Sequence, residues 1–250
     1  MNTLAILNQK GGVAKTTTAH AIAAGLTAKG YKTLMVDLDG QRSLSIISGA
    51  GGSGLTCFDV LTGKAKITQA IRRTSSGDIL PAAAALWTAD STITGKRKEY
   101  RLREALQPVS GSYDYCVIDC PPSLGILTIN ALTAADGCII PAQADVLSLE
   151  AIDQLYQTIE AVQTYTNKAL KVKGIVITRY NGRAVLSREA VEMIEDKAAE
   201  IRTHVYQTRI RENIAVKEAQ AVKEDIFSYS RRSNGAADYQ ALLNEILKEG

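Results

Sequence analysis

Short runs of apolar residues alternate along the chain with longer stretches in which apolar positions recur every three or four residues. The short runs are predicted to be strands, at Leu4–Leu7, Thr33–Val36, Asp78–Pro81, Tyr115–Ile118, Gly137–Pro141 and Val172–Thr178. They read as continuous apolar runs, which is typical of parallel strands covered on both faces. Helices are predicted at Thr16–Lys29, Tyr100–Leu106, Leu124–Ala135, Ser148–Tyr165, Leu186–Arg202 and Ala236–Lys248. The alternation predicts an α/β fold, a doubly wound and mainly parallel sheet flanked by helices.

Length and composition indicate one globular domain over residues 1–250. The chain has 250 residues, of which 46% are hydrophobic, enough for one sizeable core. No run approaches the ~18 apolar residues that a membrane-spanning helix needs. The first residues lack the basic start and the small-residue cleavage site of a secretory signal. We therefore expect a cytosolic protein.

The four cysteines do not follow a metal-binding pattern. Cys57, Cys116, Cys120 and Cys138 form no C-x-x-C pair, and the chain has only two histidines. We expect buried, reduced thiols rather than a zinc or iron–sulfur site. Cys120 follows Asp119, but no histidine lies near it in the sequence, so it is not predicted to be a nucleophile.

Positive charge is concentrated in the C-terminal third. The net charge of the chain is +3, and residues 167–232 hold 14 basic against 9 acidic side chains, a net +5. This distribution is compatible with a polyanion-binding face, although many proteins are mildly basic.

The segment between the first predicted strand and the first predicted helix has the character of a phosphate-binding loop. Its backbone N–H groups would wrap phosphates at the positive end of the helix dipole. Lys15 would reach the β- and γ-phosphates, and the Thr16 hydroxyl would bind Mg²⁺. The predicted nucleotide-binding residues are Lys10, Gly11, Gly12, Val13, Ala14, Lys15, Thr16 and Thr17.

A second lysine, Lys10, lies five residues before Lys15, on the other side of the loop. From there it cannot easily reach the γ-phosphate that Lys15 holds. It is placed to reach a nucleotide bound by a facing subunit and to neutralise charge that develops during phosphoryl transfer. The alternative is a solvated lysine beside an anion site.

Three motifs in order resemble the ParA/MinD ATPases. KGGVAKTT resembles the deviant Walker A motif, KGGxxK(T/S), of that family of P-loop NTPases. Asp37–Gln41 (DLDGQ) resembles its first switch, and Asp119–Gly125 (DCPPSLG) resembles its second switch. The resemblance implies an ATPase whose homodimer encloses two ATP molecules, with Lys10 crossing the interface as a catalytic residue.

The resemblance also implies roles for residues outside the loop. Asp39 would position or activate the attacking water, and Thr16, Asp39 and Asp119 would hold Mg²⁺. Pro121 would border the nucleotide. Arg179, in the run Thr178–Asn181 (TRYN), would border the base, and the alternative is a surface loop without a ligand contact. Asp37 remains open between support of the metal shell and capping of a local turn.

Three residues depart from the family pattern. Ala14 stands where glycine is common, so its Cβ would strain the loop if φ there is positive. Gly40 replaces the usual proline after Asp39, which should loosen the first switch. Arg42 takes a position that is usually small. These departures concern the hydrolysis rate more than nucleotide binding.

The leading functional hypothesis is a ParA-type ATPase that segregates a plasmid or chromosome. Its ATP-bound dimer would bind DNA without sequence preference, and a ParB-like adaptor would stimulate hydrolysis and release; the protein would then be nucleoid-associated. The predicted DNA-binding residues are Arg183, Arg209, Arg211 and Lys217. The alternative for these residues is a salt-bridged face, because glutamates are interleaved with them.

Two other functions are possible for this scaffold. A MinD-like ATPase on a membrane surface would end in a basic amphipathic helix, whereas Tyr239–Gly250 has one lysine and two glutamates. A metabolic ligase or phosphoryl-transfer enzyme on the same scaffold would need a substrate pocket, for which no motif is found. We therefore expect no membrane partner.

Overall fold

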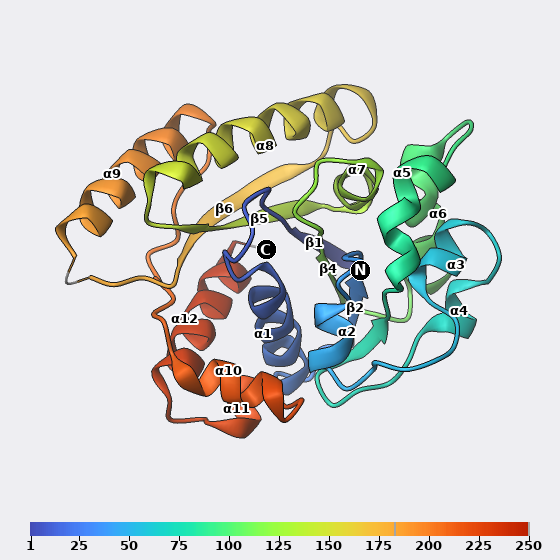
Figure 1. The fold of residues 1–250 in the computed structure, drawn as a ribbon, viewed down its shortest axis with the longest axis horizontal. Helices are drawn as coiled ribbons and strands as arrows, with labels where there is room; N and C mark the ends of the chain where they lie inside the picture. The colour runs from blue at the N-terminus through green and yellow to red at the C-terminus, as the bar shows by residue number, and fades with distance from the viewer. Residues whose placement is uncertain (183, 250) are drawn as a thin grey trace.

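The computed structural model describes residues 1–182 and 184–249, without the side chain of residue 185, and a six-stranded sheet lies at its centre (Figure 1). The strands are β1 (Asn2–Ile6), β2 (Thr33–Asp37), β3 (Asp78–Leu80), β4 (Tyr115–Asp119), β5 (Gly137–Gln143) and β6 (Lys171–Thr178). Their order is β3-β2-β4-β1-β5-β6, and every neighbouring pair is parallel. The predicted fold class and all six predicted strands are confirmed.

Helices cover both faces of the sheet. One face carries α1 (Lys15–Ala28), α2 (Ser43–Ile47), α10 (Ile214–Ala221), α11 (Ile226–Tyr229) and α12 (Asn234–Lys248). The other carries α3 (Cys57–Leu61), α4 (Ile67–Ala70), α5 (Ala89–Thr92), α6 (Arg101–Leu106), α7 (Ile126–Ala134), α8 (Val146–Tyr165) and α9 (Val185–Glu200). Short 3₁₀ helices are η1 (Ala84–Thr88), η2 (Lys98–Tyr100) and η3 (Gln107–Val109). The six predicted helices are present, whereas helices such as α2 and α10 were not predicted.

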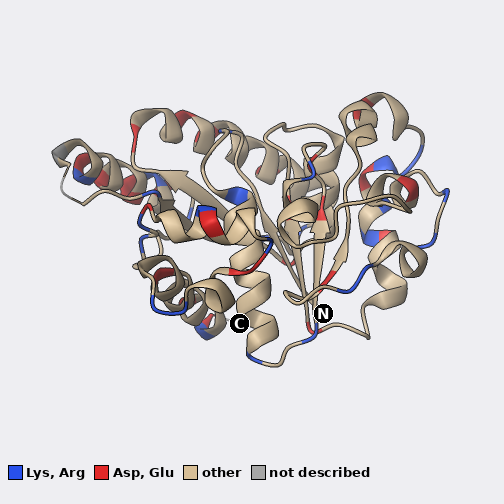
Figure 2. Ribbon diagram, turned by 60° about the horizontal axis from the view of Figure 1, so that its bottom comes forward, with Lys and Arg blue, Asp and Glu red and all other residues tan. Residues whose placement is uncertain are grey.

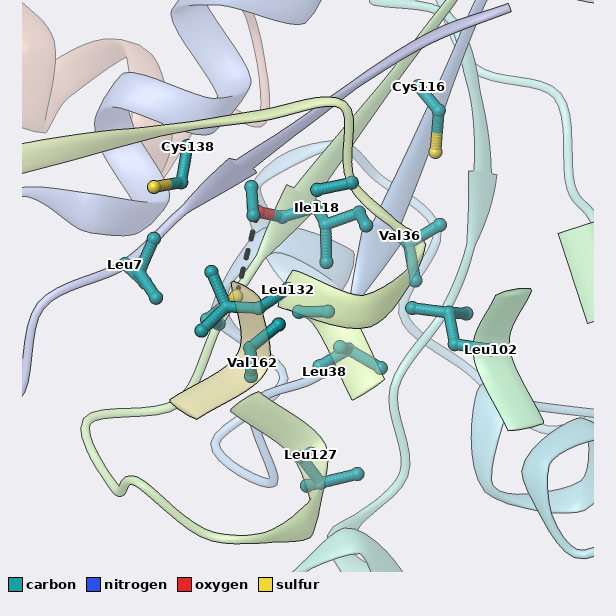
Figure 3. Close-up of a cluster of buried hydrophobic side chains, with 14 of the residues drawn as sticks. Leu7, Val36, Leu38, Leu102, Cys116, Ile118, Leu127, Leu132, Cys138 and Val162 are labelled. Atoms are coloured by element: carbon teal, nitrogen blue, oxygen red, sulfur yellow. Dashed lines mark hydrogen bonds between the residues drawn. The ribbon is translucent and has the colours of Figure 1, made fainter. Parts of the chain in front are cut away.

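Successive residues of a strand point to opposite faces of the sheet, and each face is covered by a hydrophobic core. This explains why the apolar runs are continuous. In β1, Leu4 and Ile6 pack with α1 and α12, whereas Ala5 joins the cluster on the opposite face. That second cluster includes Cys116 and Cys138 among leucines, valines and isoleucines (Figure 3). All four cysteines are buried, and burial raises the pKa of Cys120 well above its usual value, so its thiol stays protonated.

The C-terminal helix, α12, packs on α1. Tyr239, Leu242 and Leu243 are buried in the core on that face. The close approach depends on Gly25, because a Cβ there would lie 2.6 Å from Leu243 Cδ2. The apolar side of α12 is therefore already covered by protein. Among the described residues, no helix is long and apolar enough to cross a membrane.

His20 on α1 should make stability pH-dependent. Its Nε2 lies 3.1 Å from Ser76 Oγ, and burial lowers its pKa to about 4, although the charge of Asp225 acts in the other direction. Between pH 6.5 and 4 the unfolded chain binds more protons than the folded one, so stability should fall as pH falls through this window. The loss should approach about 3 kcal/mol.

The measurement is urea unfolding at several pH values for the wild type and for His20→Gln, which keeps a polar group near Ser76. The difference in unfolding free energy between the two proteins should shift by about 3 kcal/mol from pH 7 to pH 4. Parallel profiles would show that His20 titrates normally in the folded protein.

Candidate functional site

The functional site lies at the carboxyl edge of the sheet, where the loops after β1, β2 and β4 meet. In open α/β sheets this edge is where ligands bind. A cavity of about 770 Å³ opens there. Its lining includes Gly11, Gly12, Ala14, Lys15, Thr16, Thr17, Asp39, Gln41, Pro122, Arg179, Arg211, Asn213, Lys217, Gln220 and Tyr239. The structure thus brings the first switch and most of the predicted phosphate-binding loop to one cavity.

The loop adopts a turn that only certain residues tolerate. Gly12 has φ 76° and Ala14 has φ 62°, both in the left-handed region. The strain expected at Ala14 is therefore present, and it costs roughly 1–2 kcal/mol. Asn8 fixes the entry to the turn, because its Oδ1 accepts from Lys10 N at 2.9 Å while its Nδ2 donates to Pro141 O.

Lys15 is held at the cavity before any ligand binds. Its Nζ donates to the carbonyl of Lys10 at 3.1 Å, and the side chain is largely buried. Burial lowers the pKa of Lys15, while the charges of Asp119 and Asp39 act in the other direction. An ammonium group with so little hydration gains strongly from an anionic ligand.

Lys10 turns away from the cavity. Its Nζ pairs with Asp145 and lies 3.5 Å from both Gln143 Oε1 and Ser148 Oγ. Asp145 is the N-cap of α8, where it also accepts from Ser148 N. Partial burial acts to raise the pKa of Asp145, but the hydrogen bonds from Lys10 and Ser148 hold it below the usual value. The two loop lysines therefore have different partners and directions.

Asp119 fits a divalent cation. It is fully buried at the end of β4, and neither carboxylate oxygen has a hydrogen-bond partner among the described residues. Burial and the charge of Asp37 raise its pKa well above the usual value, while Thr16 and Lys15 oppose the shift. An unpaired buried carboxylate beside a threonine hydroxyl is the oxygen-donor set that Mg²⁺ uses next to phosphates.

Asp37 anchors the first switch through hydrogen bonds. It accepts from Ser45 N at 2.8 Å, from Ser45 Oγ at 2.7 Å and from Asp39 N at 3.1 Å. Asp39 in turn accepts from Gln41 N at 2.9 Å. Burial raises the pKa of Asp37 to about 6. Asp37 therefore ties the loop to α2, as the capping interpretation expects.

Two predicted nucleotide contacts need refinement. Val13 is fully buried and is not among the residues that line the cavity. Pro121 is buried, and its neighbour Pro122 lines the cavity instead. Sequence reasoning also missed Gln220, whose Nε2 donates to Thr17 Oγ1 at 2.9 Å and joins α10 to the loop helix. No motif marks this residue, because the contact spans two hundred positions.

The basic residues of the predicted DNA site carry acidic partners. Arg179 and Lys217 share Glu212, with N–O distances of 3.1 and 3.3 Å. Arg209 stacks over Tyr180 and pairs with Glu195, and Arg211 pairs with Asp238 at 2.6 Å. Figure 2 shows the blue and red positions interleaved here. Arg211 and Lys217 line the nucleotide cavity, and Arg183 lies outside the described residues.

Comparison with known proteins agrees with this geometry. A family model described as an AAA domain matches residues 1–172. The chromosome-partitioning ATPase Soj of Treponema pallidum is 39% identical over 249 residues, 98% of this chain and 96% of that protein. The chain belongs to the ParA/Soj family of ATPases. The chromosome partitioning protein ParA of Caulobacter vibrioides is 37% identical over 99% of this chain and 94% of that protein. The family expected from the sequence is confirmed.

Solved structures of other proteins have a similar fold. The cobyrinic acid a,c-diamide synthase of Mycobacterium smegmatis, crystallised with ADP and magnesium, is 34% identical with a TM-score of 0.85, covering 100% of this chain and 95% of that one. Cyanothece McdA is 22% identical with a TM-score of 0.88, over 99% of both chains, and shows the shared fold alone. This ParA/Soj-family ATPase therefore has the P-loop architecture predicted from its motifs.

Proposed function

We propose that the chain is an ATP-dependent partitioning ATPase that acts as a single domain over residues 1–250 and pairs on ATP binding. The ATP-bound dimer binds DNA without sequence preference, and hydrolysis, stimulated by a ParB-like adaptor, releases it. Two named relatives at 37–39% identity are chromosome-partitioning proteins, which supports this cellular role over others. The proposal places the protein in the cytoplasm, on the nucleoid.

The observation that carries the proposal is that the two loop lysines point in different directions and have different partners. Lys15 is desolvated at the cavity, where a phosphate of the same subunit would lie. Lys10 is directed outward onto Asp145, and both side chains stay partly exposed. A lysine on the outer side of the loop is available to a nucleotide held by a facing copy. This arrangement favours a site completed by pairing.

The residues of the nucleotide site have different proposed roles in binding ATP and Mg²⁺. The loop N–H groups and Lys15 hold the phosphates, and Thr16, Asp39 and Asp119 hold the cation. The cation, when bound, neutralises phosphate charge. Asp39 orients a water molecule. Its position for this task is held by Asp37, which accepts a hydrogen bond from the Asp39 backbone N–H. Phosphoryl transfer needs positioning and charge neutralisation more than a strong base.

DNA binding is proposed for Arg183, Arg209, Arg211 and Lys217, with competition from their acidic partners. Glu212 is shared by Arg179 and Lys217 next to the nucleotide cavity. Exposed pairs of this kind contribute little energy, so phosphate groups of DNA can replace the carboxylates. A DNA contact through Lys217 would then be linked to the state of the nucleotide site, since Lys217 also lines that cavity.

The test is DNA affinity with ATP and Mg²⁺ for the wild type and for Arg183→Glu. The charge reversal should weaken binding about tenfold and reduce the slope of log K against log salt by about 1 per lost contact. Nucleotide affinity should not change. A matched control is Arg103→Glu on α6, an exposed arginine without an ion-pair partner among the described residues.

Equal losses in the two variants would indicate a general effect of net charge and contradict a site at Arg183. Absence of DNA binding by the wild type, with binding to anionic vesicles instead, would favour the membrane-surface alternative. The burial of the apolar side of α12 favours DNA over a membrane.

A further inference from the structure

Trp87 lies directly on the first switch. Its indole covers Gly40, the residue after Asp39, and a Cβ at Gly40 would lie 2.8 Å from both Cε2 and Nε1 of the ring. The φ angle of Gly40 is not in the left-handed region, so its backbone does not itself demand glycine. Glycine is needed here because the ring occupies the space of a side chain.

The backbone that carries Trp87 is anchored by its buried neighbours, although the indole ring itself is exposed. The neighbouring Leu86 and Ala89 are both 2% exposed and belong to the core between the sheet and α6–α8. Trp87 itself is 59% exposed, an unusual setting for so large an apolar ring. A fixed 3₁₀ helix therefore holds an indole over a loop at the edge of the cavity.

The indole and Asp37 both restrain the same short loop. Asp37 accepts from the N–H of Asp39, and Asp39 accepts from the N–H of Gln41. Gly40 lies between these two hydrogen-bonded residues. As a glycine, it has the greatest backbone freedom in the loop when nothing packs against it. Its backbone is confined by the ring, which replaces the restraint that the proline common in this family would give.

We propose that Trp87 is a positioning residue that holds Asp39 for hydrolysis by covering Gly40. Trp87 is not among the residues that line the nucleotide cavity, so it acts through the loop and not on the nucleotide. The inference rests on the proposed role of Asp39. If it holds, Gly40 does not loosen the switch, because the restraint comes from a residue 47 positions later in the sequence.

The experiment is a double-mutant cycle between Trp87→Ala and Gly40→Ala, read by ATP turnover. Each single change should lower kcat about tenfold with little change in KM, the first by freeing the loop and the second by forcing the ring and loop apart. In the double variant the added Cβ no longer meets the ring. Its kcat should therefore equal that of Trp87→Ala, about tenfold above the product of the two single effects.

A second readout uses the fact that Trp87 is the only tryptophan. ATP with Mg²⁺ should change its emission in the wild type and not in Lys15→Ala. The control is Tyr165→Ala, which removes an aromatic ring that is 80% exposed and should alter neither kcat nor melting temperature.

The outcomes separate this inference from the proposed function. Multiplicative effects of the two single changes, or an unchanged kcat in Trp87→Ala with Asp39→Ala inactive, would overturn the role of Trp87 alone. Wild-type turnover by Asp39→Ala would overturn the proposed role of Asp39 and, with it, this inference.

Discussion

Replacing Lys15 with alanine should weaken ATP binding by roughly 10- to 150-fold. In the folded chain the ammonium group is buried and donates one hydrogen bond, to the Lys10 carbonyl. A phosphate oxygen would supply the charged partner that this group lacks, and a hydrogen bond to a charged group is worth about 1.5–3 kcal/mol. The measurement is titration calorimetry with ATP and Mg²⁺ under conditions that prevent turnover.

The same variant should fold normally. Burial lowers the pKa of Lys15, which means that the folded protein disfavours its charge. The ligand-free melting temperature should therefore not fall in Lys15→Ala. Lys66→Ala, at an exposed lysine before α4, is the control for loss of one positive charge and should bind ATP as the wild type does. ATP affinity of Lys15→Ala within threefold of wild type would contradict the assignment of the loop.

The parts of the fold predicted from the sequence are those whose burial pattern repeats. Each central strand is covered on both faces, so its apolar run is continuous and its limits are clear. Helices such as α8, with 20 residues, span several turns of amphipathic pattern. The 5-residue α2 and 4-residue α11 are too short for such a pattern, and they depend on tertiary contacts.

The candidate site was predictable where it is contiguous in sequence. Lys10–Thr17 forms one local turn after a strand, and Asp39 and Asp119 each follow a strand whose end reaches the same edge. Contacts across the chain were not predictable. Asp145 lies 135 residues from Lys10, and Trp87 meets Gly40 through a 3₁₀ helix that has no sequence pattern.

The predicted DNA-binding residues show another limit of sequence reasoning. Net charge directs attention to the basic C-terminal third, but charge alone does not say which carboxylates approach these residues. The structure places Glu212 between Arg179 and Lys217, and Asp238 under Arg211. The ion-paired face expected as the alternative is therefore present. DNA binding stays a proposal, which requires that phosphates replace these carboxylates when the gain in contacts is larger.

Replacing Lys10 with alanine should abolish ATP-dependent pairing while leaving the ATP affinity of the isolated subunit unchanged. In the unpaired chain Lys10 Nζ is occupied by Asp145 and contributes nothing to the cavity, so its loss removes no ligand contact there. Across a dimer interface the same charge would face phosphates, where a cation supplied by the neighbour is worth roughly 10³-fold in rate. Turnover should therefore fall by about that factor.

The pairing is measured by sedimentation velocity with saturating ATP and Mg²⁺ in an Asp39→Ala background, which slows hydrolysis. Asp145→Asn provides the opposite test. Its amide oxygen can still cap α8, but it no longer holds Lys10 by charge, so pairing should become about threefold tighter because the lost ion pair is partly exposed and worth less than about 1 kcal/mol. If Lys10→Ala paired as well as its parent, Lys10 would serve its own subunit and the two-lysine argument would fail. If Asp145→Asn weakened pairing, Asp145 would belong to the interface itself, and the ion pair would be a feature of the dimer and not a restraint that pairing must release.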